Sequence, residues 1–236
     1  MPRALGALAA QVASGQRPVA EPRDAATVAL VREADGDGPG VEVLLLRRVR
    51  AMDFAPGAHV FPGGSVDPGD AGADLGAVSA QDLGSVLGVT PDRCRALVGA
   101  AMRETFEESR VRLHAALLTP WARWITPEAS DRRYDTWFFV AAMPADQVAD
   151  AGIGTGGDAE ADAATWLRPA AALDAARAGE ITLLPPTAVT LQQLAAHDSV
   201  AEILTQRRTI TPLMPSVQVE DGRAWLTLPD GVEYPL

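Results

Sequence analysis

Six consecutive residues say most about how this chain folds and works: Arg103-Glu104-Thr105-Phe106-Glu107-Glu108. They lie near the end of a predicted helix, where Glu104, Glu107 and Glu108 stand at positions i, i+3 and i+4 and therefore share one side of it. Like charges at this spacing destabilise a helix, and the helix dipole disfavours anions near its carboxyl end. Such a cluster either faces solvent or holds cations, and its oxygen atoms suit Mg²⁺, Mn²⁺ or Ca²⁺.

The helix itself has a clear predicted start at Thr90-Pro91-Asp92. Threonine is a good N-cap, proline fits the first helical position, and an acid in the first turn favours the dipole. The helix is expected to run to about Ser109. Upstream of it, the loop that begins at Gly63-Gly64 lets a backbone carbonyl approach a metal ion or a phosphate.

The rest of the chain mixes strands and helices without regular βαβ alternation. Apolar and β-branched runs predict strands at 25–33, 41–47, 59–61, 111–118, 134–142 and 163–167, with a closing hairpin of 217–219 and 224–228. Further helices are expected at 79–87, 169–178, 186–196 and 199–207. This order predicts an α+β fold, an α/β/α sandwich in which helices flank a mixed β-sheet.

Composition narrows the classes of function. The net charge of −11 and the lack of a Lys/Arg run speak against a nucleic-acid partner. The sequence has no run of 18 apolar residues, so no membrane partner is expected. Cys94 is the only cysteine, which excludes an intrachain disulfide and favours a reducing compartment, so a cytoplasmic protein is expected.

The glutamates belong to a longer pattern that resembles the Nudix hydrolase signature, Gly-x5-Glu-x7-Arg-Glu-U-x-Glu-Glu-x-Gly-U, where U is aliphatic. The positions that fit are Gly64, Arg103, Glu104, Glu107, Glu108 and Val111, with Asp70 where the first Glu belongs. Three features depart from the signature. An insertion separates Asp70 from Arg103 by 32 residues rather than seven, Thr105 stands at an aliphatic position, and Arg110 replaces the glycine.

Other stretches resemble one branch of the Nudix family, the peroxisomal coenzyme A diphosphatases with a long insertion in the signature. They are residues 61–67, 124–127 and 133–139. The resemblance covers about residues 25–180, which we expect to form the Nudix domain, with the insertion at about 71–90. Residues 1–24 would be an N-terminal arm, and 181–236 a helical and hairpin extension packed on the same domain.

The resemblance implies a Mg²⁺ or Mn²⁺ site and a small nucleotide-diphosphate substrate. It assigns catalysis to Glu107, Glu104 and Arg103. It assigns the metal to Glu104, Glu107, Glu108, the Gly63 carbonyl and a later acid, for which we choose Glu160 over Asp158 and Asp162. Arg47, Arg48 and Gly64 lie where they can bind substrate phosphates, and surface charge is the alternative explanation for the two arginines.

The substrate is left open by the sequence. Coenzyme A or acyl-coenzyme A is the first choice, and ADP-ribose or NADH is the alternative. A Nudix-fold module that binds ligand without turnover is a further reading, as is an RNA-processing enzyme, which the net charge disfavours. We expect the insertion and the last ~60 residues to wall the substrate pocket, and the resemblance allows a homodimer.

Overall fold

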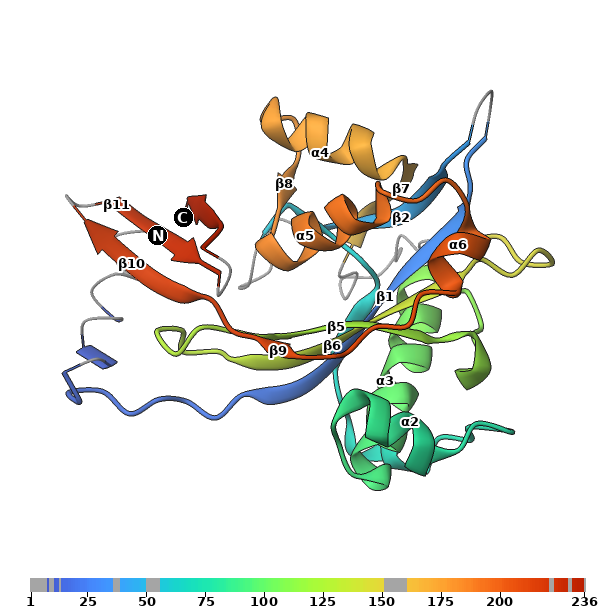
Figure 1. The fold of residues 1–236 in the computed structure, drawn as a ribbon, viewed down its shortest axis with the longest axis horizontal. Coiled ribbons are helices and arrows are strands. Elements are labelled where there is room, and N and C mark those ends of the chain that lie inside the picture. The colour runs from blue at the N-terminus through green and yellow to red at the C-terminus, as the bar shows by residue number, and fades with distance from the viewer. Residues whose placement is uncertain are drawn as a thin grey trace.

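The computed structural model describes residues 8, 11–12, 14–35, 39–49, 56–150, 161–220, 223–228 and 231–235. Within these ranges the chain forms a mixed β-sheet with helices on both faces, as the sequence predicts (Figure 1). No helix in the described ranges combines the length and apolar character that crossing a membrane requires.

The central sheet is built around β1 (Arg23–Glu33), which pairs parallel with β6 (Tyr134–Ala142) and antiparallel with β2 (Val41–Arg48). The strand order is β8 (Thr182–Leu183), β3 (Ala58–Val60), β2, β1, β6, β5 (Thr119–Ile125) and β9 (Pro212–Leu213). Two further strands join the side of this path. β4 (Gly63–Ser65) pairs with the first half of β1, and β7 (Ala161–Leu167) pairs with β2.

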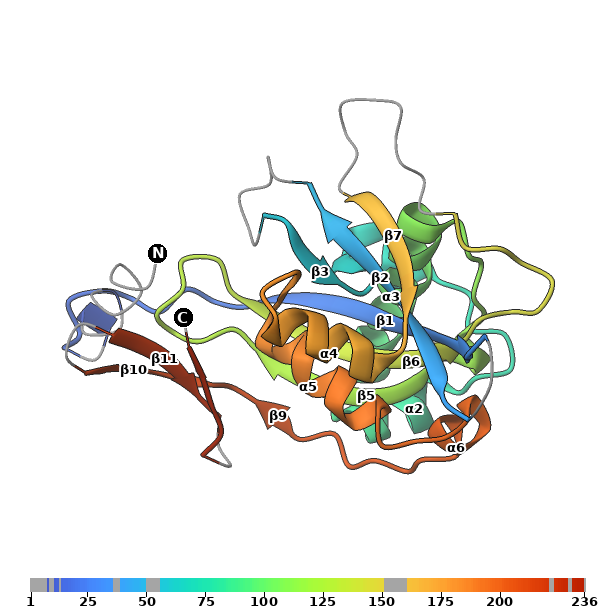
Figure 2. The same ribbon diagram turned by 90° about the horizontal axis from the view of Figure 1, so that it is seen from above.

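Helices cover both faces of this sheet because its inner strands carry apolar side chains on alternate sides. From β1, Val28 and Leu30 face α2 (Ala80–Leu87) and α3 (Pro91–Ser109), whereas Ala29 and Val31 face the opposite layer. That layer consists of α4 (Pro169–Arg177), α5 (Pro185–Leu194) and α6 (Val200–Leu204). Figure 2 shows α4 and α5 lying across the sheet.

α3 begins and ends where the sequence predicts. The Thr90 side chain accepts a hydrogen bond from the Arg93 N–H, and Pro91 opens the helix. Thr105, at the aliphatic position of the signature, is fully buried, and its hydroxyl donates to the Ala101 carbonyl at 2.7 Å. The polar atom that replaces an aliphatic group is therefore satisfied within the helix.

The insertion forms α2 and the loop into α3, on the α3 side of the sheet (Figure 1). The Trp137 indole N–H donates to the Leu87 carbonyl at 3.2 Å. Arg93, at the start of α3, pairs with Asp24 of β1 and Asp135 of β6, with nitrogen–oxygen distances of 2.6 and 3.2 Å. The end of α2 and the start of α3 are therefore both fixed to the sheet.

One predicted strand is wrong. Residues 111–118 contain the short 3₁₀ turn η2 (Ala115–Leu117), and the strand is β5, which follows it. A register shift between Pro120 and Ala122 places Trp121 and Trp124 on the same face although they are three residues apart. This bulge removes the two-residue alternation that would have revealed the strand.

The C-terminal part differs in two details. The helix expected at 199–207 ends at Leu204. The closing hairpin, β10 (Ser216–Glu220) with β11 (Arg223–Thr227), is confirmed, and β12 (Glu233–Pro235) adds a third strand to it. This small sheet extends from the body at the end where the β5–β6 loop lies (Figures 1 and 2).

α3 ends at Arg110, which adopts the left-handed conformation with φ 60° and ψ 10°. Its N–H donates to the Phe106 carbonyl, which is the usual way for a helix to end on glycine. A side chain in this conformation costs roughly 1–2 kcal/mol. The signature glycine is therefore missing, but the backbone geometry that favours it is kept.

We expect Arg110→Gly to raise the free energy of unfolding by about 0.5–1 kcal/mol, because the released strain exceeds the added freedom of glycine in the unfolded chain. Urea unfolding measures the change. Arg110→Ala is the control, since it removes the guanidinium and keeps the Cβ atom. Equal stability of the two variants would show that the left-handed conformation carries no strain.

Candidate active site

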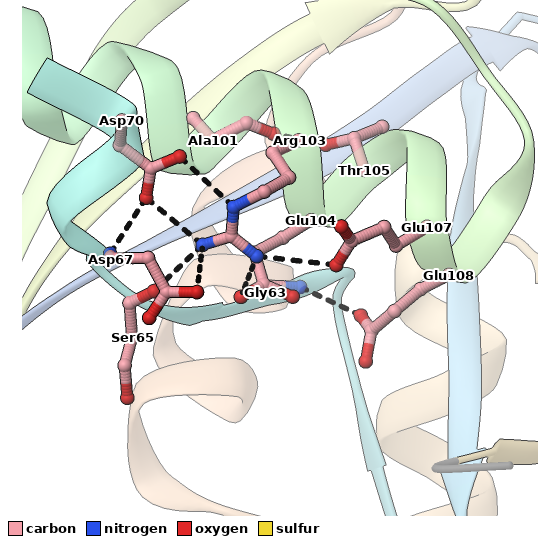
Figure 3. A network of polar contacts seen from close by, with 10 residues as sticks. All are labelled: Gly63, Ser65, Asp67, Asp70, Ala101, Arg103, Glu104, Thr105, Glu107 and Glu108. Carbon is pink, nitrogen blue, oxygen red and sulfur yellow. Dashed lines mark hydrogen bonds and ion pairs between the residues drawn. The ribbon is translucent and has the colours of Figure 1, made fainter. Parts of the chain in front are cut away.

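The carboxyl end of α3 lies against Gly63 and Gly64, the two residues that follow the bend at Pro62 and begin β4 (Figure 3); they are called the glycine turn below. The Gly63 N–H donates to a Glu108 carboxylate oxygen at 2.8 Å. A Cβ atom on Gly63 would come within 3.0 Å of Ala26 and Thr27 in β1, and one on Gly64 within 3.0 Å of the Glu104 carboxylate. The turn thus fits between β1 and the glutamates because it carries no side chains.

Arg103 is the centre of the polar contacts in this region (Figure 3). Its guanidinium donates to the Glu104 carboxylate at 2.8 Å, to Glu107 at 3.2 Å and to the Ser65 carbonyl at 2.9 Å. These bonds tie α3 to the end of β4 and hold two of the glutamates on the side of the turn.

Asp70, where the signature has glutamate, accepts two hydrogen bonds from Arg103, both at 2.9 Å. Its side chain is 4% exposed, against 27% for Arg103, and it also accepts from the Asp67 N–H at 2.7 Å. It lies in the 3₁₀ turn η1 (Pro68–Gly72), which packs closely on α3 because Gly99 has no side chain there. Across the insertion, Asp70 is therefore still the partner of Arg103.

The hydrogen bonds with Asp70 are the main cause of a raised pKa at Arg103, and those with Glu104 add to it. Burial acts in the opposite direction and is outweighed. Arg103 thus stays a cation, and four acids lie around its guanidinium: Asp67 at 3.9 Å, Asp70, Glu104 and Glu107. The arrangement concentrates negative charge beside the glycine turn.

The three glutamates are brought to the same turn but reach different partners. Glu104 and Glu107 reach Arg103, whereas Glu108 reaches the Gly63 N–H. In the described part of the chain, no three His, Cys, Asp or Glu side chains lie close enough together to hold a metal ion in these positions. Side-chain rotation would be needed for the expected convergence, and the exposed Glu107, with 53% of its side chain accessible, has the most freedom to rotate.

A cavity of about 670 Å³ adjoins this site, and Gly63, Gly64 and Glu104 are part of its wall. The β5–β6 hairpin contributes Trp124, Thr126, Pro127, Ser130, Arg132 and Tyr134. Phe61 and Phe138 add apolar surface. This composition, apolar surface with several polar groups, is typical of a small-molecule site.

The prediction that the insertion and the C-terminal residues form the walls of the cavity is half right. The C-terminal extension does contribute, through residues 184–187, Pro215 and Leu226. None of the insertion residues 71–90 lines the cavity, because the insertion packs on the α3 side of the sheet. The two arginines also differ, since Arg48 lines the cavity and the exposed Arg47 does not.

Some lining residues were not found from the sequence, and some predicted ones lie beyond reach. Ser130 and Arg132 lie between two stretches that the sequence singles out, at 124–127 and 133–139. This position in the sequence was the signal that could have identified them as lining residues. Glu160 and Asp158 lie outside the described residues, as does the side chain of Asp162.

Comparison with known proteins places this site in context. No family model matches the chain. In sequence it is 28% identical over 169 residues to nudix hydrolase 7 of Caenorhabditis elegans, covering 65% of this chain and only 55% of that protein. It is 26% identical to the acyl-coenzyme A diphosphatase NUDT19 of Gallus gallus, covering 77% of this chain and 70% of that one.

A comparison with solved structures points to the same family as the sequence comparison. A NUDIX hydrolase from Alicyclobacillus acidocaldarius superimposes with a TM-score of 0.63 and 23% identity, covering 81% of this chain and 99% of that one. The chain therefore has the fold of the Nudix hydrolases and resembles them in sequence.

Asp70→Asn should lower the free energy of unfolding by about 2–4 kcal/mol, because Arg103 would lose its buried carboxylate partner. Urea unfolding measures the loss. Asp67→Asn is the matched control, since the Asp67 side chain is 67% exposed and 3.9 Å from Arg103. The control should change stability by no more than about 0.5 kcal/mol; similar losses in both variants would contradict a special role for the buried pair.

Proposed function

We propose that the protein hydrolyses the diphosphate linkage of a nucleoside diphosphate derivative, most directly coenzyme A or acyl-coenzyme A, with Mg²⁺ or Mn²⁺. The observation that carries this proposal is the position of Glu104 and Glu108 against Gly63 and Gly64 at the wall of a 670 Å³ cavity, with Glu107 held beside Glu104 by Arg103. The likeness to the chicken acyl-coenzyme A diphosphatase supports the choice of substrate.

The residues around the turn fit a divalent cation. Carboxylate and carbonyl oxygens are the ligands that Mg²⁺ and Mn²⁺ prefer, and Glu104, Glu107, Glu108 and the Gly63 carbonyl would hold the ion. The acids gathered around Arg103 favour cation binding. A bound ion supplies charge neutralisation at the diphosphate and acidifies a water molecule. We retain Glu160, with Asp158 and Asp162 as its alternatives, as a further ligand.

The chain's own groups then have separate tasks. Arg103 orients the Glu104 and Glu107 carboxylates by charge-assisted hydrogen bonds, and Asp70 fixes Arg103 in turn. Glu107, the most exposed of the three, has solvent access from which to take a proton from the attacking water. Arg48, in the cavity wall, can bind a phosphate or another anionic group of the substrate.

Glu107→Gln and Glu108→Gln should each reduce turnover by about 100-fold or more, because each removes a charge from the reacting centre while keeping the side-chain shape. Steady-state rates with Mn²⁺ and circular dichroism of each variant test this. Glu180→Gln, on an exposed residue outside the cavity wall, is the control and should keep the wild-type rate. Near-normal turnover in both α3 variants would contradict the site assignment.

Mass spectrometry of the products should identify the broken bond. Coenzyme A, acetyl-coenzyme A, ADP-ribose and NADH are each incubated with the protein and Mg²⁺ or Mn²⁺. We expect 3′,5′-ADP from the coenzyme A substrates, and no product when EDTA removes the ion. AMP from ADP-ribose or NADH alone would keep the reaction type and replace the substrate, whereas turnover that persists in EDTA would contradict the role of the metal.

A further inference from the structure

One side chain, Arg133, joins three segments of the chain around the cavity. Its Nε donates to the Thr126 carbonyl at 3.0 Å, its Nη1 to the Ala20 carbonyl at 2.7 Å, and its Nη2 to the Met214 sulfur at 3.4 Å. Thr126 belongs to the β5–β6 hairpin, Ala20 precedes β1, and Met214 follows β9. Arg133 itself is 7% exposed.

The partners of Arg133 are unlike those of the other arginines near this end of the sheet. Arg93 and Arg123 share the buried Asp135 carboxylate. Arg133 instead donates to two carbonyl oxygens and a thioether, which carry no formal charge. Burying a guanidinium against neutral acceptors costs more than burying it against a carboxylate, so a well-packed apolar residue would be the less costly choice for stability alone.

Two of the three anchor points, Thr126 and Met214, lie in or next to the cavity wall, and the third, Ala20, precedes β1, whose Ala25 is part of the wall. Thr126 is part of the wall, Met214 is followed by Pro215, which is also part of it, and Ser130, Arg132 and Tyr134 flank Arg133. In addition, the Arg133 carbonyl accepts a hydrogen bond from the Arg23 N–H at 2.9 Å. Arg133 therefore contacts residues in or next to the cavity wall without being a lining residue itself.

We infer that Arg133 is a positioning residue for substrate affinity: it holds the β5–β6 hairpin, the segment before β1 and the segment after β9 in the relative positions that shape the cavity. This inference rests on the proposed function, in that the cavity takes the part of the substrate outside the diphosphate. The planar guanidinium offers five N–H donors in fixed directions, which suits three acceptors from three segments. A lysine ammonium is a compact group on a flexible stem and cannot replace that geometry.

The test compares Arg133→Met and Arg133→Lys with the matched variant Arg208→Met. Arg208 donates to the Trp121 carbonyl at 2.9 Å, so it also ties the C-terminal part to β5, but neither residue lines the cavity. With coenzyme A and Mn²⁺, we expect Arg133→Met to raise KM by about tenfold or more and to keep kcat within about threefold, because the α3 glutamates are untouched. Arg133→Lys should raise KM too, and Arg208→Met should leave it unchanged.

A second readout separates this inference from the proposed reaction. Isothermal calorimetry in EDTA measures the Kd of coenzyme A and of ADP-ribose without turnover. Weaker binding by both Arg133 variants than by wild type supports the inference even if wild type hydrolyses neither probe. The inference is overturned if the Arg133 variants keep wild-type KM and Kd, if Arg208→Met weakens binding equally, or if wild type binds neither probe. Arg133→Lys decides the outcome if the Met variant does not fold.

Discussion

The rest of the structure depends on one close contact, between the carboxyl end of α3 and the turn at Gly63 and Gly64. No side chain separates them, so the Glu104 and Glu108 carboxylates reach the backbone of the turn directly. The Asp70–Arg103 pair holds this contact from the other side, since Arg103 also donates to the Ser65 carbonyl at the end of β4. Carboxylates that would repel one another are kept together by this one arginine and by the glycine backbone.

The layers of the fold serve that contact from opposite faces of the sheet. On one face the insertion supports α3, through the pairing of Arg93 with Asp24 and Asp135 and the bond from Trp137 to Leu87. On the other face the start of α5, together with Pro215 and Leu226, completes the cavity that begins at Glu104. The insertion therefore supports the helix, and the C-terminal part forms one side of the cavity.

The sequence predicted the features that depend on neighbouring residues. Thr90-Pro91 starts α3, and the spacing of the glutamates places them on one side of the helix. The family signature singled out both Asp70 and Arg103 but not their pairing, since 32 residues separate them in the sequence. Features set by distant contacts were missed: the bulge in β5 hides its alternation, and the meeting of Pro215 with the β5–β6 hairpin depends on the packing of the whole chain.

Direct measurement of Mn²⁺ binding by electron paramagnetic resonance tests the central claim that these carboxylates hold a cation. The wild-type protein should bind Mn²⁺, and Gly64→Ala should weaken binding by about tenfold or more, because the added Cβ would displace the Glu104 carboxylate. Gly69→Ala, where nothing lies within 4 Å of the added atom, should bind as wild type does. Absence of Mn²⁺ binding by the wild type, or equal binding by all three proteins, would contradict the account.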